Sequence, residues 1–233
     1  MTLRAALLLL AAALAPSASA LTAAPAAKPD WTRVVTATPQ GGFRMGNPAA
    51  AVTLIEYGSL ACPHCRHFEE TGYKPLVQTY VRSGRVSYEF RSLLISGPDI
   101  SITMLTRCAG AGKFFAMSQY VFATQPQWLK KLEDMSAADI SALDKLTDQQ
   151  RVVRYAQIAK MGPIAARFGV TPARARQCLA DPKGLKRLLD MTQAAMAAGV
   201  KQTPTFIVSG KATDASTWEG LEPELKSALG ERG

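Results

Sequence analysis

Cysteine and long apolar runs are both scarce in this sequence. The 233 residues include four cysteines, and only Cys62 and Cys65 are close together. Structural zinc modules usually need two such pairs, so we expect no metal site, and no motif predicts a cofactor. Residues 5–15 form the longest uninterrupted apolar run, and no other segment approaches the roughly 20 residues of a membrane span. With 48% apolar and 19% charged residues, the rest is typical of a globular protein with a sizeable core.

The N-terminal run has the features of an export signal. Arg4 precedes the apolar stretch, and Ala18-Ser19-Ala20 supplies the small residues of a cleavage site. We therefore expect residues 1–20 to be a signal peptide that is removed after Ala20. An uncleaved anchor is the alternative, but eleven apolar residues are too few to span a bilayer. Export would place the cysteines in an oxidising compartment, where an even number suggests disulfides.

Excess positive charge is the other bulk feature. The net charge of +9 falls to +8 if the predicted signal peptide, whose one charged residue is Arg4, is removed. The basic residues are scattered, and aromatic residues do not alternate with them as they do in nucleic-acid sites. We expect a solvated basic surface and no nucleic-acid partner.

The order of predicted elements indicates an α/β protein. Residues 21–42 are expected to form a flexible leader with a possible edge strand at Val34 and Val35. A buried strand at 51–57, a helix at 66–80 and an alternating strand at 85–94 predict a βαβ unit with parallel strands.

Residues 99–181 have no strand pattern and are expected to be a helical insertion. Helices are predicted at about 100–122, 137–143, 148–168 and 172–179. An amphipathic helix from Pro182, a strand at 205–208, a short strand near 212–213 and a helix at 221–229 follow. Because these late strands need the first sheet to pair with, residues 43–98 and 182–233 should form one domain.

The Cys62-Pro63-His64-Cys65 motif lies between the first strand and its helix. A helix N-terminus has unpaired N–H groups and a partial positive charge, and both favour a thiolate on Cys62. Pro63 suits the first turn, where its missing N–H would have no partner. The two-residue spacing lets Cys65 resolve a mixed disulfide formed at Cys62, and His64 could stabilise the thiolate.

Two other interpretations of the motif stay open. A bridge across so short a loop would be an inert disulfide that stabilises the fold little. Metal binding assisted by His64 or His67 is the second.

Elsewhere, Thr203-Pro204 precedes an apolar strand, which suits a loop with a cis peptide bond. Taken alone, Glu56 would be a partly exposed charge on a strand.

Together these features resemble the DsbA family of bacterial periplasmic thiol-disulfide oxidoreductases. The resemblance rests on C-P-H-C six residues after Glu56, the long helical insertion and the late T-P-T-F strand, and it covers about residues 43–229. It implies a thioredoxin fold with a central mixed sheet and an inserted helical subdomain. It also implies an exposed attacking Cys62 and a buried resolving Cys65.

The resemblance assigns roles to further residues. Pro204 would be a cis-proline beside the disulfide, and Thr203 would contact bound peptide. Glu56 would be a buried acid that helps to move the Cys65 proton, and Glu69 also matches a family position. Gln202 departs from the glycine that relatives often have, which puts the detail of the peptide-binding loop in question.

Cys108 and Cys178 lie in the helical region, far apart in sequence. They resemble the second disulfide of a subset of the family, notably from alphaproteobacteria, and we expect a structural bridge between them.

By this resemblance the protein would be a periplasmic oxidase acting on reduced or unfolded exported proteins. A DsbB-like membrane protein would reoxidise it, and we expect a monomer. A reductase or isomerase, and a non-catalytic thioredoxin-fold binding protein, are the alternatives.

Overall fold

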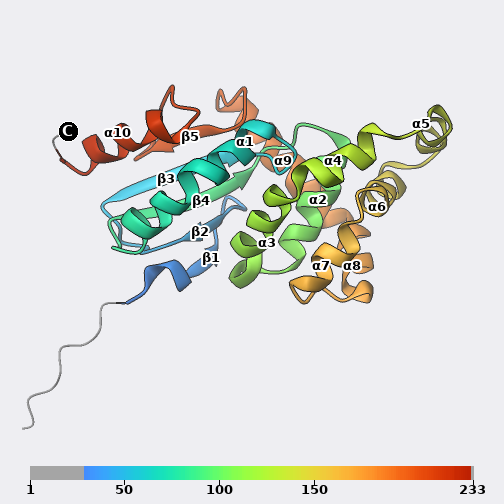
Figure 1. Ribbon diagram of the computed structural model, residues 1–233, viewed down its shortest axis with the longest axis horizontal. Coiled ribbons are helices and arrows are strands. Elements are labelled where there is room, and N and C mark those ends of the chain that lie inside the picture. Colours follow the sequence, from blue (N-terminus) through green and yellow to red (C-terminus); the bar gives the residue numbers. More distant parts are fainter. Residues whose placement is uncertain (1–28, 232–233) are drawn as a thin grey trace, which may run out of the picture.

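The computed structural model describes residues 29–231 (Figure 1). The predicted signal peptide and the first part of the predicted leader lie outside the described residues. In the described part, no helix is both long and apolar enough to cross a membrane.

Six strands form one mixed sheet in the order β1-β2-β4-β3-β5-β6. Their bounds are β1 Val35–Ala37, β2 Phe43–Met45, β3 Val52–Gly58, β4 Val86–Ser92, β5 Thr205–Val208 and β6 Lys211–Ala212. Strands β3 and β4 are parallel, and all other neighbours are antiparallel. The predicted α/β class with a mixed sheet is confirmed.

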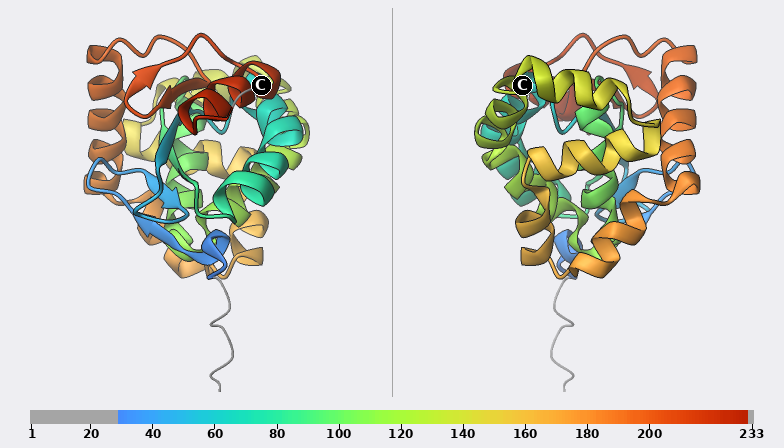
Figure 2. Two further views of the ribbon diagram at one scale, coloured as in Figure 1. Left: turned by 90° about the vertical axis from the view of Figure 1, so that its left-hand side faces the viewer. Right: turned by 90° about the vertical axis from the view of Figure 1, so that its right-hand side faces the viewer.

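The crossover between β3 and β4 is one helical run. It comprises α1 (Pro63–Phe68) and the π-helical segments η2 (Glu69–Tyr73) and η3 (Leu76–Val81). Figure 2 shows this run and α9 (Pro182–Ala197) on opposite sides of the sheet, so both faces of the central strands are covered. Burial on both faces explains why β4 is buried at six of its seven positions.

The N-terminal part of the sheet differs from the prediction. Residues 29–42 contain the short helix η1 (Trp31–Arg33) and the edge strand β1, and β2 follows as an unpredicted strand. Phe43 and Met45 pair with Phe90 and Tyr88 of β4. Three residues are too few to show alternation, and it is this pairing with β4 that makes the segment a strand.

The helical region also differs in detail. Its helices are α2 Gly97–Cys108, α3 Ala111–Ala123, α4 Gln125–Glu133, α5 Ala137–Asp144, α6 Asp148–Ile158, α7 Met161–Arg167 and α8 Pro172–Leu179. The helix predicted at 100–122 is interrupted at Gly110, whose φ of 79° favours glycine. The helix predicted at 148–168 is interrupted at Lys160, and α4 was not predicted.

These helices lie beside one end of the sheet (Figure 1), and the last helix, α10 (Trp218–Ala228), returns to it. The α10 helix starts three residues before the predicted bound, and β6 lies one residue earlier than expected. Aromatic contacts join the parts. Phe43 of β2 stacks on Phe114 of α3 at a centroid distance of 4.1 Å, and Phe68 contacts Phe206 of β5 at 4.6 Å.

Candidate active site

The cysteine motif stands at the carboxyl end of β3, where the chain turns into α1. Cys62 is the N-cap residue of α1 with an extended backbone, Pro63 occupies the first turn, and Cys65 follows in the same turn. This is the predicted position, and it points the unpaired N–H groups of α1 toward the first sulfur.

The loop before β5 completes the site. Thr205 pairs with Tyr57 near the end of β3, so the residues before Thr205 lie at the sheet edge that carries the motif. The Thr203–Pro204 peptide bond is cis. The Cys62 thiol donates a hydrogen bond to the carbonyl oxygen of Thr203, at a Sγ–O distance of 3.3 Å.

Cys62 is less accessible than the family resemblance implies. The residue is 4% exposed, whereas an exposed attacking cysteine was expected. The expectation is wrong because the Thr203 carbonyl group contacts the sulfur and the Gln125 side chain contacts the Cys62 carbonyl oxygen. Pro63 and His64 remain exposed, and they mark the open side of the motif.

The two thiols have opposite acidities. A hydrogen bond from the Cys65 thiol is the largest cause that lowers the pKa of Cys62, to about 5, against the opposing effect of burial. The Thr203 side chain and the backbone N–H groups of Cys65 and His64 add to this lowering. His64 therefore acts on the sulfur through its backbone, and its imidazole is on the exposed surface.

Cys65 is 1% exposed, and this burial is the main reason why its pKa rises well above the ordinary value of a thiol. Its hydrogen bond to Cys62 and the nearby Glu56 raise the pKa further. Near neutral pH, reduced protein thus holds a thiolate at Cys62 and a thiol at Cys65.

Glu56 is the buried acid of this site. It is 2% exposed, and Tyr88 of the neighbouring strand donates its phenolic hydrogen to Oε2 at 2.5 Å. Burial raises the pKa of Glu56 to about 8 even though the Tyr88 bond lowers it. At neutral pH Glu56 is mostly protonated, and it can give up a proton to a neighbouring base.

Glu69 on η2 extends the acidic group. Burial raises its pKa to about 8, and the proximity of Glu56 adds to the shift. The pKa of the Tyr73 phenol is raised for the same reasons, burial first. The region around Cys65 therefore contains several acids that stay uncharged at neutral pH.

Comparison with known proteins agrees with this geometry. The family model described as thioredoxin matches residues 38–227, which is most of the chain. The chain belongs to the thioredoxin family. Among solved structures, a protein-disulfide isomerase from Novosphingobium aromaticivorans is 27% identical, with a TM-score of 0.76 over 81% of this chain and 97% of the other.

The alpha-DsbA1 structure from Wolbachia pipientis is 18% identical, with a TM-score of 0.65 over 80% of this chain and 90% of that one. It supports the thioredoxin fold, and the predicted structural resemblance to DsbA-type proteins is confirmed.

Among curated proteins, relatives from Rickettsia bellii and Rickettsia typhi are each 25% identical and provisionally named protein-disulfide oxidoreductases. These matches cover 80% and 79% of this chain. The chain spans 64% and 61% of the lengths of those relatives.

In this thioredoxin-family protein, three residues near the motif were not predicted from the sequence. The Gln125 side-chain amide donates to the carbonyl oxygens of Leu60 and Cys62, at 2.8 and 3.1 Å. Ser59 and Asp99 form a buried hydrogen bond beside the same loop. Gln125 has no signal in the sequence because its helix α4 was not predicted, whereas Ser59 is marked only by its position three residues before Cys62.

The other two cysteines form a disulfide, which joins the end of α2 at Cys108 to α8 at Cys178, 70 positions further along the chain. Cys108 lies nine residues beyond Asp99 along α2, roughly 13 Å at the helical rise. Cys62 and Cys65 are the free thiols.

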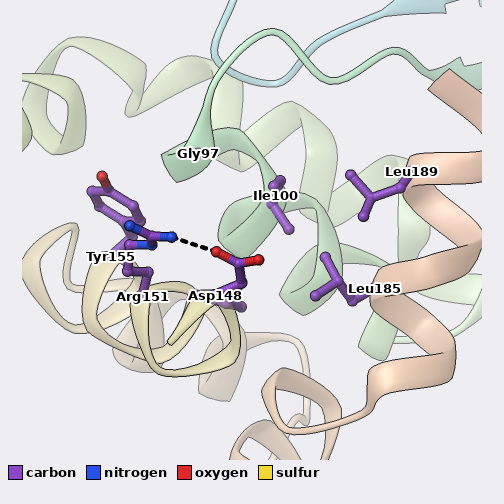
Figure 3. A pocket seen from close by; sticks show the side chains of 8 residues that line it. Gly97, Ile100, Asp148, Arg151, Tyr155, Leu185 and Leu189 are labelled. Atoms are coloured by element: carbon purple, nitrogen blue, oxygen red, sulfur yellow. Dashed lines mark hydrogen bonds and ion pairs between the residues drawn. The ribbon is translucent and has the colours of Figure 1, made fainter. Parts of the chain in front are cut away.

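A cavity of about 380 Å³ opens between α2, α6 and α9 (Figure 3). Its lining is largely apolar, with Ile100, Leu185 and Leu189 facing an Asp148–Arg151 ion pair. None of its lining residues belongs to the cysteine motif or to the cis-proline loop.

Proposed function

We propose that this protein is a dithiol oxidase of the bacterial periplasm that transfers a Cys62–Cys65 disulfide to reduced exported proteins. One observation carries the proposal: the pKa of Cys62 is lowered to about 5 while that of its partner Cys65 is raised. A stabilised thiolate favours the reduced form of the motif, and a motif that is stable when reduced is a strong oxidant.

The reaction begins with the motif oxidised. A thiolate of the substrate attacks Sγ of Cys62, the bond between Cys62 and Cys65 breaks, and its electron pair leaves on Sγ of Cys65. The product is a mixed disulfide between the substrate and Cys62. Cys65 then needs a proton, because its burial disfavours the thiolate.

Glu56 is the residue that we assign to supply this proton. Its carboxyl group is buried, uncharged at neutral pH and close enough to Cys65 for its charge to act on that thiol. Tyr88 holds the carboxyl group in place. Glu69 is the next buried acid, and it is also protonated at neutral pH, so we assign it to the same proton supply as Glu56.

A second substrate thiolate then attacks the substrate sulfur of the mixed disulfide and releases Cys62 as a thiolate. Over these steps the substrate dithiol loses two electrons and two protons, and the motif gains both electrons. One proton ends on Cys65 through Glu56, which is protonated again, and the other goes to the solvent because Cys62 leaves as a thiolate. Thr203 and cis-Pro204 are positioned to contact the substrate chain, because Thr203 already contacts Cys62 through its carbonyl group. Exposed His64 forms the other side of the approach to the sulfur.

Catalysis requires that the motif be reoxidised. We assign this step to a DsbB-like membrane protein that passes the electrons to a quinone, by resemblance to the DsbA family. The predicted signal peptide at residues 1–20 supports export, and we propose that the mature protein is a monomer.

Equilibration with glutathione tests the direction of the reaction. We expect the purified protein to be fully reduced in a buffer in which thioredoxin, with a potential of about −270 mV, stays largely oxidised. It should also oxidise a reduced, unfolded model protein such as ribonuclease A, and Cys62→Ala should abolish this activity. Full activity of the Cys62→Ala variant would favour a non-catalytic binding protein, and a potential below that of thioredoxin would exclude the oxidase.

Isomerase activity is the second candidate, because the Novosphingobium protein with a TM-score of 0.76 is described as a protein-disulfide isomerase. Scrambled ribonuclease A distinguishes the two functions. An isomerase restores its activity in a glutathione buffer faster than an oxidase does, whereas an oxidase acts on the fully reduced substrate.

A further inference from the structure

A second buried carboxyl group, Asp99, lies on the other side of the motif from Glu56 along the chain. It is in the first turn of α2 and is 0% exposed. Three groups donate hydrogen bonds to it: the Ser59 hydroxyl at 2.7 Å, the Ile95 N–H at 3.2 Å and the Thr103 hydroxyl at 3.2 Å. Among the ion pairs of residues 29–231, none includes Asp99. Such an acid, buried without a cation, is costly to keep charged.

Ser59 connects this carboxyl group to the reacting cysteine. Its hydroxyl donates to Asp99 and accepts the N–H of Ala61 at 3.0 Å. Its carbonyl oxygen accepts the N–H of Cys62 at 3.2 Å. Ser59 therefore holds the turn before α1 through both its hydroxyl and its carbonyl group. Asp99 in turn holds the Ser59 hydroxyl.

Helix capping accounts for only part of this arrangement. Ser96 caps α2 by accepting the Asp99 N–H, and Thr103 lies one turn further along the same helix. The bond from Ser59 has no such local role, because Ser59 is 40 residues earlier in the chain and belongs to the catalytic loop. Asp99 therefore links the start of the helical insertion to the active site.

The charge of Asp99 also acts on the motif. Burial raises the pKa of Asp99 to about 6, three hydrogen bonds oppose this shift, and the nearby Cys62 thiolate raises it further. The interaction is reciprocal, so an ionised Asp99 disfavours the thiolate.

The other groups around Asp99 are uncharged or face elsewhere. The residues that contact Asp99 by hydrogen bonds or cap its helix carry no charge: Ser59, Ile95, Ser96 and Thr103. Among the residues of the motif, Cys62 is the titratable group whose charge acts on Asp99. On α6, Asp148, Arg151 and Tyr155 line the cavity beside Gly97 and Ile100 (Figure 3). On α9, the neighbouring contact is the Thr192 hydroxyl, which accepts the N–H of Leu94.

We propose that Asp99 is a positioning residue that holds the Cys62 loop through Ser59 and whose negative charge limits the oxidising strength of the motif. This inference rests on the proposed thiol-disulfide exchange at Cys62 and deepens it. The motif would then be controlled by two buried acids with different tasks, with Glu56 exchanging protons with Cys65 and Asp99 restraining the thiolate of Cys62.

Asp99→Asn separates charge from position. The Asn carbonyl oxygen can accept from Ser59 and Ile95, and the Asn amide can donate to the Thr103 hydroxyl, which is both donor and acceptor. All three contacts are therefore retained while the charge is lost. Asp148→Asn is the matched control, because it removes a carboxylate from the neighbouring α6 cavity without touching the motif.

The measurement is the thiolate absorbance of reduced Cys62 against pH, together with the glutathione equilibrium constant at pH 7.5 and pH 5. For Asp99→Asn we expect the glutathione equilibrium to shift about three- to tenfold toward reduced protein at pH 7.5, where Asp99 is charged. The pKa of Cys62 should stay unchanged, because Asp99 is still protonated at the pH where Cys62 titrates. At pH 5 the variant and the natural protein should converge, since Asp99 is then protonated. Asp148→Asn should match the natural protein at both pH values.

An Asp99→Asn protein that folds normally but leaves the equilibrium constant unchanged at pH 7.5 would overturn the inference, as would a shift that persists at pH 5. If Asp99→Asn does not fold, Ser59→Ala provides the second test, because it breaks the link and leaves α2 intact. Ser59→Ala should change the equilibrium constant, and an unchanged value refutes the link. Since the titration needs no substrate, failure of the oxidase assay in the natural protein would be a separate result.

Discussion

At the scale of single residues, the chemistry of the motif is set by what surrounds each sulfur and not by the four letters C-P-H-C. Cys62 and Cys65 are three residues apart, but their pKa values shift in opposite directions, because one thiol gains donors and the other is buried beside acids. The sequence predicts the thiolate through the helix N-terminus. It does not predict that the Thr203 side chain lowers the pKa of Cys62, because Thr203 is 141 positions away along the chain.

The acidity of Cys62 predicts a pH-dependent stability of the reduced protein. A folded pKa of about 5 lies below the ordinary thiol value of 9.0, so the thiolate stabilises the fold fully above pH 9 and not at all below pH 5. Relative to Cys62→Ser, the reduced protein should lose about 2 kcal/mol of unfolding free energy between pH 7 and pH 5. Denaturant unfolding of both proteins under reducing conditions measures this, and a constant difference across the range would contradict it.

The buried Glu56 predicts the opposite trend. Its folded pKa of about 8 exceeds the ordinary 4.5, so its contribution to stability is fully present below pH 4.5 and is lost as the pH rises through 8. Glu56→Gln keeps an acceptor for Tyr88 and should raise the unfolding free energy of the reduced protein by about 3 kcal/mol at pH 7 and by almost nothing at pH 4.5.

The exposed Glu70→Gln is the control and should show no such pH-dependent gain. The Glu56→Gln enzyme should also release Cys65 more slowly in single-turnover exchange, since its amide cannot donate a carboxyl proton.

At the scale of elements, the sequence predicts those parts whose pattern is carried within one segment. Strands β3 and β4, the crossover helix and the order of the late elements were all predicted because each contains its own alternation, spacing or capping residues. Strand β2 and helix α4 were missed. The first exists because Phe43 and Met45 pair with β4. The second begins with Gln125-Pro126, and its docking depends on the carbonyl groups of the motif.

Helix α4 contributes the one polar side chain of the insertion that donates to the backbone of the catalytic loop around Cys62. Gln125→Ala leaves the Leu60 and Cys62 carbonyl oxygens without this donor, and we expect a loss of about 1 to 3 kcal/mol in unfolding free energy. The loosened loop should also show a measurable change in the pKa of Cys62. Gln127→Ala, at an exposed position of the same helix, should change neither quantity.

At the scale of the whole molecule, hydrogen bonds join the insertion to the loop that carries the motif, and a disulfide joins two helices within the insertion. Near the motif, Asp99 accepts a hydrogen bond from Ser59 of the loop before α1, and Gln125 donates one to the same loop. At the far end of α2 the link is covalent and lies within the insertion itself, where Cys108 and Cys178 tie α2 to α8. The family resemblance predicted this pairing, whereas spacing alone left the partners open.

The Cys108–Cys178 disulfide should stabilise the insertion without taking part in exchange. It closes a loop of 70 residues, for which the chain-entropy model gives about 4 kcal/mol as the loss on replacing both cysteines with alanine. The thiolate pKa of Cys62 should be unchanged in that double variant, since Asp99 and Gln125 keep their contacts with the loop.

Thiol titration of the natural protein supplies the control: mild reduction should expose two thiols, and strong reduction after unfolding should expose four. If the double variant unfolds at the same denaturant concentration, the disulfide does not stabilise the insertion. If its Cys62 titrates differently, the two links are not independent, and the insertion would have to transmit the state of the disulfide along α2 to Asp99.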